Sequence, residues 1–194
     1  MERLFYGSLA EPMSCIVGAF HAQYHTTPGN YVHEMGIVSG GKMIILAGAG
    51  PMGMGAIDYA IHGPRKPSVL VVTDIDAARL DRAEKLLSPK EAKTHGVTLH
   101  YVNTTGETDA KARLLSISGQ EGYNDVFVFA PVRPVVELGD SLCGRDGCLN
   151  FFAGPTDPSF SSMINLYNMH YNAVHIAATS GGNTDDLRES ISLM

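Results

Sequence analysis

Three glycines, Gly48, Gly50 and Gly53, have a spacing that can bring backbone amides close to a phosphate group. We expect Gly48 to permit a tight turn, Gly50 to let the main chain approach a pyrophosphate, and Gly53 to let a following helix pack closely. Pro51 suits the first turn of that helix, where its missing N–H is no loss, and Met52 follows it. Because a helix start presents free N–H groups and positive partial charge, this segment predicts a pyrophosphate site.

An acidic residue stands where the sugar of a dinucleotide is expected. Asp74 ends an apolar run about 20 positions after Gly53, where a carboxylate can accept hydrogen bonds from both adenosine ribose hydroxyls. The same carboxylate would repel a 2′-phosphate, so NAD is favoured over NADP. The alternative is that Asp74 or Asp76 merely caps the next helix, and we interpret Asp76 as the cap and Asp74 as the ribose ligand. Arg79 is left open between a solvated helix residue and a contact to a 2′-phosphate.

Short apolar runs alternate with helical patterns and predict the elements that position these residues. The expected strands are Met43–Leu46, Val69–Thr73, Thr98–Val102, Asp125–Phe129, Cys148–Ala153 and Val174–Thr179. The expected helices are Leu9–Tyr24, which ends at Pro28, Gly29 and Asn30, and then Met52–Ala60, Ala77–Leu87, Thr108–Ile117 and Val132–Leu142. This alternation demands parallel pairing with right-handed crossovers. The predicted fold class is α/β, a doubly wound parallel six-stranded Rossmann sheet with helices on both faces.

Further cofactor contacts are expected at the carboxyl ends of the later strands, where ligands of such sheets bind. By position they are Ala130, Pro131, Val132, Gly154, Pro155, Thr179 and Ser180. Arg133 lies beside the same crevice and is left open between a contact to an anionic group and a surface residue that opens a helix.

Three segments, Ser8–Cys15, Gly41–Gly53 and Thr73–Asp76, together resemble the medium-chain dehydrogenase/reductase family, and among its members the zinc-dependent polyol (sorbitol-type) dehydrogenases. Val17–His25 and Tyr31–Gly36 are similar to the sorbose 1-phosphate reductases. The resemblance implies an NAD-dependent zinc oxidoreductase whose substrate is a polyol or ketose, such as L-sorbose 1-phosphate.

The resemblance covers essentially the whole chain but only the middle third of such an enzyme. We therefore expect residues 1–40 to form a linking helix and lead-in segment, and residues 41–194 to form the dinucleotide-binding Rossmann domain. The catalytic domain is expected to be absent from this chain, which would then bind NAD(H) without turnover.

The resemblance also implies a metal role for Glu11, at the position of a zinc-shell ligand. Zn²⁺ accepts carboxylate oxygen beside cysteine and histidine, although an acidic residue is also favoured at any helix start. The other implied ligands, a cysteine and a Gly-His-Glu motif, do not occur here. His33-Glu34-Met35-Gly36 imitates that motif, but it lacks the preceding glycine and is one residue short in spacing, so we interpret it as linker.

Two further pairs of residues, one of histidines and one of cysteines, are of types that can bind a metal. His21 and His25 would share a helix face, for which an exposed surface or a contact with the missing domain is favoured over a metal. Cys143 and Cys148 bracket a turn between helix and strand and are interpreted as buried structural thiols.

Composition limits the partners. The net charge of −6 argues against nucleic acid and anionic lipid, and no apolar run approaches the roughly 20 residues of a membrane span. Three cysteines and the lack of a signal peptide favour the cytoplasm. We expect a small polyol or sugar as partner, and a homodimer through the edge at Val174–Thr179 as an option.

Other function classes remain as rivals or are excluded. Tyr-x-x-x-Lys and Gly-x-Ser-x-Gly do not occur, which removes short-chain dehydrogenases and α/β-hydrolases. A free-standing NAD-sensing module stays open. An adenosylmethionine-dependent methyltransferase is less favoured, because that class usually lacks the long pyrophosphate-facing helix start at Pro51.

Overall fold

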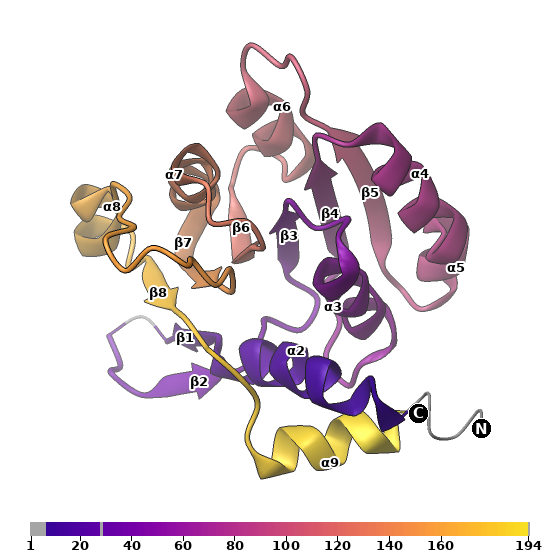
Figure 1. Cartoon of the computed structure of the whole chain (residues 1–194). Helices are drawn as coiled ribbons and strands as arrows, with labels where there is room; N and C mark the ends of the chain where they lie inside the picture. Colours follow the sequence, from indigo (N-terminus) through magenta and orange to yellow (C-terminus); the bar gives the residue numbers. More distant parts are fainter. Residues whose placement is uncertain (1–6, 28, 194) are drawn as a thin grey trace.

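The computed structural model describes residues 7–27 and 29–193, and its centre is a parallel sheet of six strands. The strands are β3 (Lys42–Leu46), β4 (Val69–Asp74), β5 (Thr98–Asn103), β6 (Tyr123–Val128), β7 (Cys143–Phe151) and β8 (His175–Ala177). Their spatial order is β5-β4-β3-β6-β7-β8, and each neighbouring pair is parallel. The chain therefore builds outward from β3 in one direction and then in the other, as predicted for a doubly wound sheet (Figure 1).

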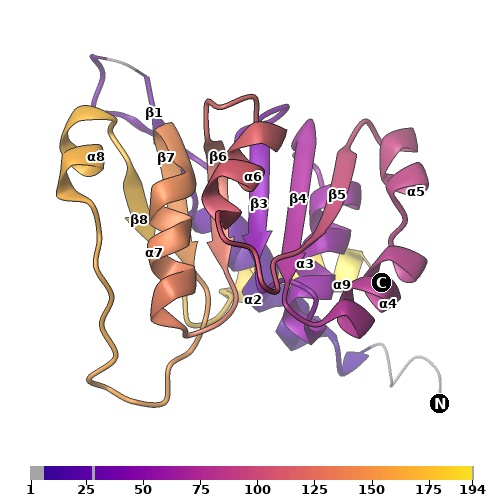
Figure 2. The same ribbon diagram turned by 90° about the horizontal axis from the view of Figure 1, so that it is seen from above.

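Helices cover both faces of this sheet. They are α2 (Ala10–Ala22), α3 (Pro51–His62), α4 (Ala77–Leu86), α5 (Pro89–Thr94), α6 (Ala110–Ile117), α7 (Arg133–Leu142), α8 (Leu166–Tyr171) and α9 (Thr184–Ser192). Seen from above, α6 and α7 lie on one face, and α2, α3 and α9 lie on the other (Figure 2). Among the described helices, none has both the length and the apolar character needed to cross a membrane.

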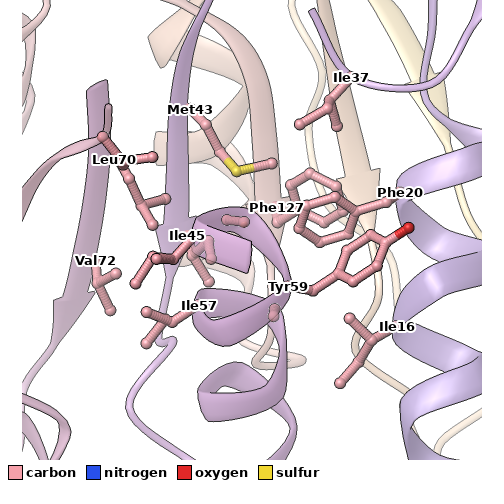
Figure 3. Packing of buried hydrophobic residues seen from close by; sticks show 14 of the residues in the cluster. Ile16, Phe20, Ile37, Met43, Ile45, Ile57, Tyr59, Leu70, Val72 and Phe127 are labelled. Atoms are coloured by element: carbon pink, nitrogen blue, oxygen red, sulfur yellow. The ribbon is translucent and has the colours of Figure 1, made fainter. Parts of the chain in front are cut away.

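The central strand explains why both faces are buried. Successive side chains of a strand point to opposite faces, so Met43 and Ile45 join the cluster under α2 and α3, while Ile44 joins the cluster under α6 and α7. Figure 3 shows Phe20 closing the first cluster between Tyr59 and Phe127, with ring centroids 4.9 Å from each. An uninterrupted apolar strand is what a sheet covered on both sides requires.

Several element boundaries differ from the prediction. The first helix ends at Ala22 rather than Tyr24, because the chain then enters β1 (Tyr24–Thr26), which pairs antiparallel with β2 (His33–Met35). His33–Met35, interpreted as linker, thus forms a short exposed strand between α2 and β3. Helices α5, α8 and α9 were not predicted. Pro28 of the expected turn lies outside the described residues, as do positions 1–6 and 194 of the expected domains.

The last two strands also differ from their expected ranges. β7 begins at Cys143, five residues earlier than predicted, and Ala153 falls after it. The segment between Cys143 and Cys148 is thus an irregular part of the strand instead of a turn, with a register shift and a positive φ of 57° at Asp146. β8 is limited to three residues, so Thr179 follows the strand.

The first and last helices of the described chain pack together. The hydroxyl of Ser190 in α9 donates to the carbonyl oxygen of Ala10 in α2 at 2.7 Å, and His21 Nδ1 lies 2.8 Å from Asp186 Oδ1. These contacts hold α9 against α2, and the two helices lie side by side (Figure 1).

Candidate functional site

The glycine loop joins β3 to α3 and is packed as the spacing predicts. A Cβ atom at Gly53 would lie 1.9 Å from the carbonyl oxygen of Gly48, so a side chain there would force the helix away from the turn. A Cβ atom at Gly50 would meet no described atom within 4 Å, which leaves the main chain there open to a bound group. Helix α3 begins at Pro51, and within the described residues no side chain caps its first N–H groups.

The turn itself depends on two neighbouring residues. Ala47 carries a positive φ of 55°, whereas Gly48 is not among the described residues with positive φ. Glycine is needed at position 48 because a Cβ atom would lie 2.5 Å from Cγ2 of Ile45. Gly48 therefore permits the tight turn, as predicted, by leaving space beside Ile45, while the positive φ falls on Ala47.

The carboxylate of Asp74 lies at the base of the loop and is 6% exposed. Its Oδ2 accepts a hydrogen bond from the N–H of Ala49 at 3.1 Å. Its Oδ1 accepts from the N–H groups of Ile75 at 2.8 Å and Asp76 at 3.0 Å. A carboxylate offers about four acceptor positions, so roughly one remains, on Oδ2. Asp74 therefore faces the glycine loop in a fixed orientation.

The charged residues of α4 and its N-cap have different roles: one caps the helix, and another contacts the glycine loop. Asp76 caps the helix as predicted, with its Oδ1 accepting from the N–H groups of Ala78 and Arg79. The Arg79 Nε atom lies 3.4 Å from Asp76 Oδ2, and the side chain is 57% exposed. Arg82, which sequence reasoning missed, donates from Nη2 to the carbonyl oxygen of Ala49 at 3.4 Å. Its spacing of three residues from Arg79 was the available signal, because such residues share a helix face.

A cleft of about 640 Å³ opens where the chain leaves β7 and β8. It brings together the predicted residues after both strands and the start of α3, along with one residue of α2: Met52, Gly154, Pro155, Thr179, Ser180 and Cys15. Ala130, Pro131 and Val132 are not among its lining residues. They follow β6, whose end adjoins the glycine loop, since the N–H of Phe129 donates to the carbonyl oxygen of Leu46 at 3.0 Å. Arg133 begins α7, is exposed, and does not line the cleft.

The hydroxyl of Thr179 is the unsatisfied polar group of this cleft. Its Oγ1 is buried and has no hydrogen-bond partner in the part of the chain that the structure describes. A buried hydroxyl without a partner costs roughly 1–3 kcal/mol. A polar ligand in the cleft would remove that cost if the side chain turned its hydroxyl toward the cleft, because Oγ1 has almost no accessible surface in the present rotamer.

Comparison with known proteins shows which dehydrogenases and reductases the chain is similar to. The chain is 58% identical over 186 residues to mannitol-1-phosphate 5-dehydrogenase of Aliivibrio fischeri, covering 96% of the chain and 44% of that protein. It is 50% identical over 190 residues to L-sorbose 1-phosphate reductase of Klebsiella pneumoniae, covering 98% of the chain and 45% of that protein. The resemblance to the medium-chain dehydrogenases is confirmed. No family model matches the chain.

Solved structures of such dehydrogenases share the fold. The 2R,3R-butanediol dehydrogenase of Bacillus subtilis matches with a TM-score of 0.71 at 16% identity, over 96% of this chain and 45% of that one. A zinc-binding dehydrogenase of Sinorhizobium meliloti, bound to NADP, matches with a TM-score of 0.72 at 16% identity, over 96% of this chain and 47% of that one. The chain thus spans about 45% of the length of the curated relatives it matches.

Glu11, which the family resemblance marks as a metal ligand, stands in the first turn of α2 with an exposed side chain. Its Oε1 accepts a hydrogen bond from the Sγ of Cys15 at 3.4 Å, and Cys15 lines the cleft. Burial and the contact with Glu11 raise the pKa of the Cys15 thiol, so it keeps its proton at neutral pH. A zinc site takes about four ligands, so Glu11 fits as one contributor and does not hold an ion alone.

The histidine pair of the sequence does not share a helix face. His25 lies in β1, where its Nε2 is 3.0 Å from Asp125 Oδ1 and its Nδ1 is 2.8 Å from the carbonyl oxygen of Asp146. His21 ends α2 and pairs with Asp186 of α9. His21 is exposed, as expected, whereas His25 is buried, so the expectation of an exposed face was wrong for His25.

Cys148 is buried, as predicted, whereas Cys143 is only partly buried. Cys15, Cys143 and Cys148 are all free. Burial raises the pKa of Cys148 to about 12 and raises that of Cys143 further. Such thiols stay protonated, so this pair is not a ready metal site.

Proposed function

We propose that this chain is the NAD(H)-binding part of a zinc-dependent medium-chain dehydrogenase that acts on a phosphorylated polyol or ketose. The observation that carries the proposal is the start of α3, where uncapped N–H groups behind Gly50 open onto free space beside the buried Asp74. Anions bind readily at such a helix start. The names of the relatives, a mannitol-1-phosphate dehydrogenase and a sorbose 1-phosphate reductase, support the reaction class and the substrate class.

In this proposal the glycine loop and the cleft bind different parts of the cofactor. The N–H groups of Pro51's helix hold the diphosphate, with Gly50 giving the close approach. Asp74 accepts from one ribose hydroxyl through the free position of Oδ2, which is fewer than the two hydroxyls expected from the sequence. Thr179 hydrogen-bonds the nicotinamide end, and Ala130–Val132 border it at the end of β6.

The preference for NAD over NADP rests on charge near that ribose. The buried carboxylate of Asp74 would repel a 2′-phosphate in surroundings where burial weakens solvent screening. Arg79 is paired with the helix cap, and Arg82 is directed at the carbonyl oxygen of Ala49. Among the described residues, neither guanidinium forms an ion pair with Asp74.

The chemistry needs groups that this chain does not supply by itself. When bound, NAD(H) supplies hydride transfer and zinc supplies Lewis-acid polarisation of the substrate oxygen. Glu11 contributes one carboxylate to the metal from the edge of the cleft, and the walls around Thr179 and Met52 limit access of water. The remaining ligands belong to the part of the relatives' length that this chain does not span, so the chain alone binds cofactor and does not turn over substrate.

The outer edge of β8 is a surface through which two copies of the chain could associate. β8 is the last strand in the sheet order, and within the described residues its outer edge has no strand beside it. We propose that this edge pairs with the same edge of a second copy in a homodimer.

Calorimetric titration with NADH and NADPH tests the cofactor assignment. We expect NADH to bind more tightly than NADPH. Asp74→Ala should lower the affinity for NADH at least 10-fold and reduce the difference in affinity between NADH and NADPH. Thr179→Val should weaken NADH about 5-fold and leave folding intact, because it removes a hydroxyl that has no partner in the free chain. Binding of S-adenosylmethionine in place of NADH would contradict the assignment. Robust turnover of sorbitol or L-sorbose 1-phosphate with zinc and cofactor would contradict the proposed inactivity.

A further inference from the structure

Three potential metal ligands gather on the surface where α3 meets α5. His62 is the last residue of α3, Glu91 lies in α5, and His95 is the C-terminal cap of α5. Their ligand atoms all lie within 4.8 Å of one another. The Nε2 atom of His62 is 3.6 Å from Oε1 of Glu91, and the two imidazole rings meet edge-on with centroids 4.6 Å apart. Two imidazoles and a carboxylate thus converge from two helices.

A fourth side chain orients the first imidazole. Asp58 lies one turn before His62 on α3, and its Oδ1 is 2.8 Å from the Nδ1 of His62. A carboxylate at Nδ1 keeps the proton on that nitrogen and leaves the lone pair of Nε2 free. Nε2 is also the atom that faces Glu91. Metal-binding histidines commonly have such a supporting carboxylate.

We propose that His62, Glu91 and His95 bind a divalent transition-metal ion of the zinc class, with Asp58 as the supporting carboxylate. Imidazole nitrogen and carboxylate oxygen are ligands that Zn²⁺ accepts, and water can fill the fourth position. With ligand bonds of about 2.1 Å, tetrahedral ligand atoms lie about 3.4 Å apart, so the cluster needs to contract by roughly 1 Å. The side chains of His62 and Glu91 are 33% and 46% exposed, so they can move without repacking the core.

The position of the cluster favours a cation and separates it from the proposed cofactor site. It sits at the C-terminal end of α3, where the partial charge of the helix is negative. The 12 residues of α3 rise about 18 Å, so the cluster lies about that far from the glycine loop at the other end of the helix. The ion therefore fastens α3 to α5 and takes no part in hydride transfer.

Titration of metal-free protein with Zn²⁺, measured by calorimetry, tests this site. A parallel titration with Co²⁺ is measured by its visible absorption spectrum. We expect one ion per chain and a higher thermal midpoint with Zn²⁺. His62→Gln and His95→Gln should each weaken Zn²⁺ binding at least 30-fold, and Asp58→Asn about 10-fold. Far-UV circular dichroism of each variant reports whether it is folded, independently of cofactor binding. His95 lies after the end of α5, so its substitution is the safer test of the two.

Matched controls distinguish this site from others on the molecule. His170→Gln removes an exposed histidine of α8 and should leave Zn²⁺ binding unchanged. Glu11→Gln should also leave it unchanged, because that residue belongs to the proposed catalytic metal. The inference is overturned if the wild-type chain binds no Zn²⁺, if His62→Gln and His95→Gln bind it as the wild type does, or if Glu11→Gln abolishes the bound ion. None of these results bears on NADH binding, so the two proposals fail separately.

Discussion

The two ends of the parallel sheet differ in the residues they carry and in how fully those residues are used. At the amino ends, Gln23, His25, Asp125, Asp146 and His175 form what we call the amino-end cluster. At the carboxyl ends, the glycine loop and the cleft consist mainly of glycine, alanine, proline and methionine. The acids and bases at the amino ends are mostly paired with each other, although a cleft of about 520 Å³ that Asp146 and His175 line opens there too. Open main-chain donors and an unpartnered hydroxyl occur at the other end.

Most polar atoms of the amino-end cluster are paired within this chain, although Gln23 Oε1 is buried and has no hydrogen-bond partner among the described residues. Asp125 accepts from Gln23 Nε2 at 3.2 Å, contacts His25 Nε2 at 3.0 Å, and accepts from the N–H of Val38 at 3.0 Å. These contacts tie β1 and the approach to β3 onto the sheet. Side chains of catalytic type therefore do not mark a functional site unless some of their hydrogen-bonding capacity remains free.

Removing the centre of the amino-end cluster should give the largest change in stability. Asp125 is 1% exposed, and Asp125→Ala would leave His25 and Gln23 buried beside the lost carboxylate. We expect the free energy of unfolding to fall by about 3–5 kcal/mol, as for a broken buried pair. Urea denaturation measures this change. Asp81→Ala, at an exposed aspartate of α4, serves as the control and should cost little. NADH affinity of the folded variant should be unchanged, and a large loss of affinity would show that the two ends are coupled.

Two glycines of the loop separate packing from binding. Gly53→Ala should lower the free energy of unfolding by about 1–3 kcal/mol and abolish NADH binding, because its Cβ would meet the carbonyl oxygen of Gly48. Gly50→Ala should weaken NADH at least 10-fold with a stability change below about 1 kcal/mol, since its Cβ meets no described atom. Gly7→Ala, also in open space by the described atoms, is the matched control. Equal stability losses at positions 50 and 53 would contradict this division.

The smallest expected effect is the pH dependence of the amino-end cluster. Burial disfavours protonated His25, but hydrogen bonds and charges of Asp125 and Asp146 outweigh it and raise its pKa above the usual value of about 6.5. A raised pKa in the folded state stabilises the protein below about pH 6.5, and this stabilisation is lost as pH rises through the folded value. Unfolding free energies between about pH 6 and 9 should therefore decline, and His25→Gln should flatten the decline. An unchanged slope in that variant would exclude His25 as its cause.

At lower pH a different group of the same cluster makes the stability depend on pH. Burial raises the pKa of Asp146, but hydrogen bonds from His175 and Thr26 outweigh burial, and the net shift is downward. A lowered pKa contributes stability above its usual value, near 3.8, and this contribution is lost as pH falls through the folded value. The two groups therefore act in separate pH ranges, so a measurement above pH 6 does not include the contribution of Asp146.

What sequence reasoning could predict depends on local patterns. The strand and helix alternation, the glycine spacing, Pro51 at the start of α3, and Asp74 at the end of β4 all follow from neighbours within a few positions. Because backbone periodicity and turn chemistry are local, these features identified the α/β sheet and the glycine loop without coordinates. The same logic failed at His25, which was assigned to a helix that had already ended.

Tertiary structure decided which side chains are free and which are used. His25 and Asp125 are 100 positions apart, and only the packing of β1 against the six-stranded sheet at β7 brings them together. Arg82 reaching Ala49, the unpartnered hydroxyl of Thr179, and the convergence of His62 with His95 also depend on contacts between separate elements. No short-range pattern encodes them, because hydrogen-bond saturation is a property of the packed molecule as a whole.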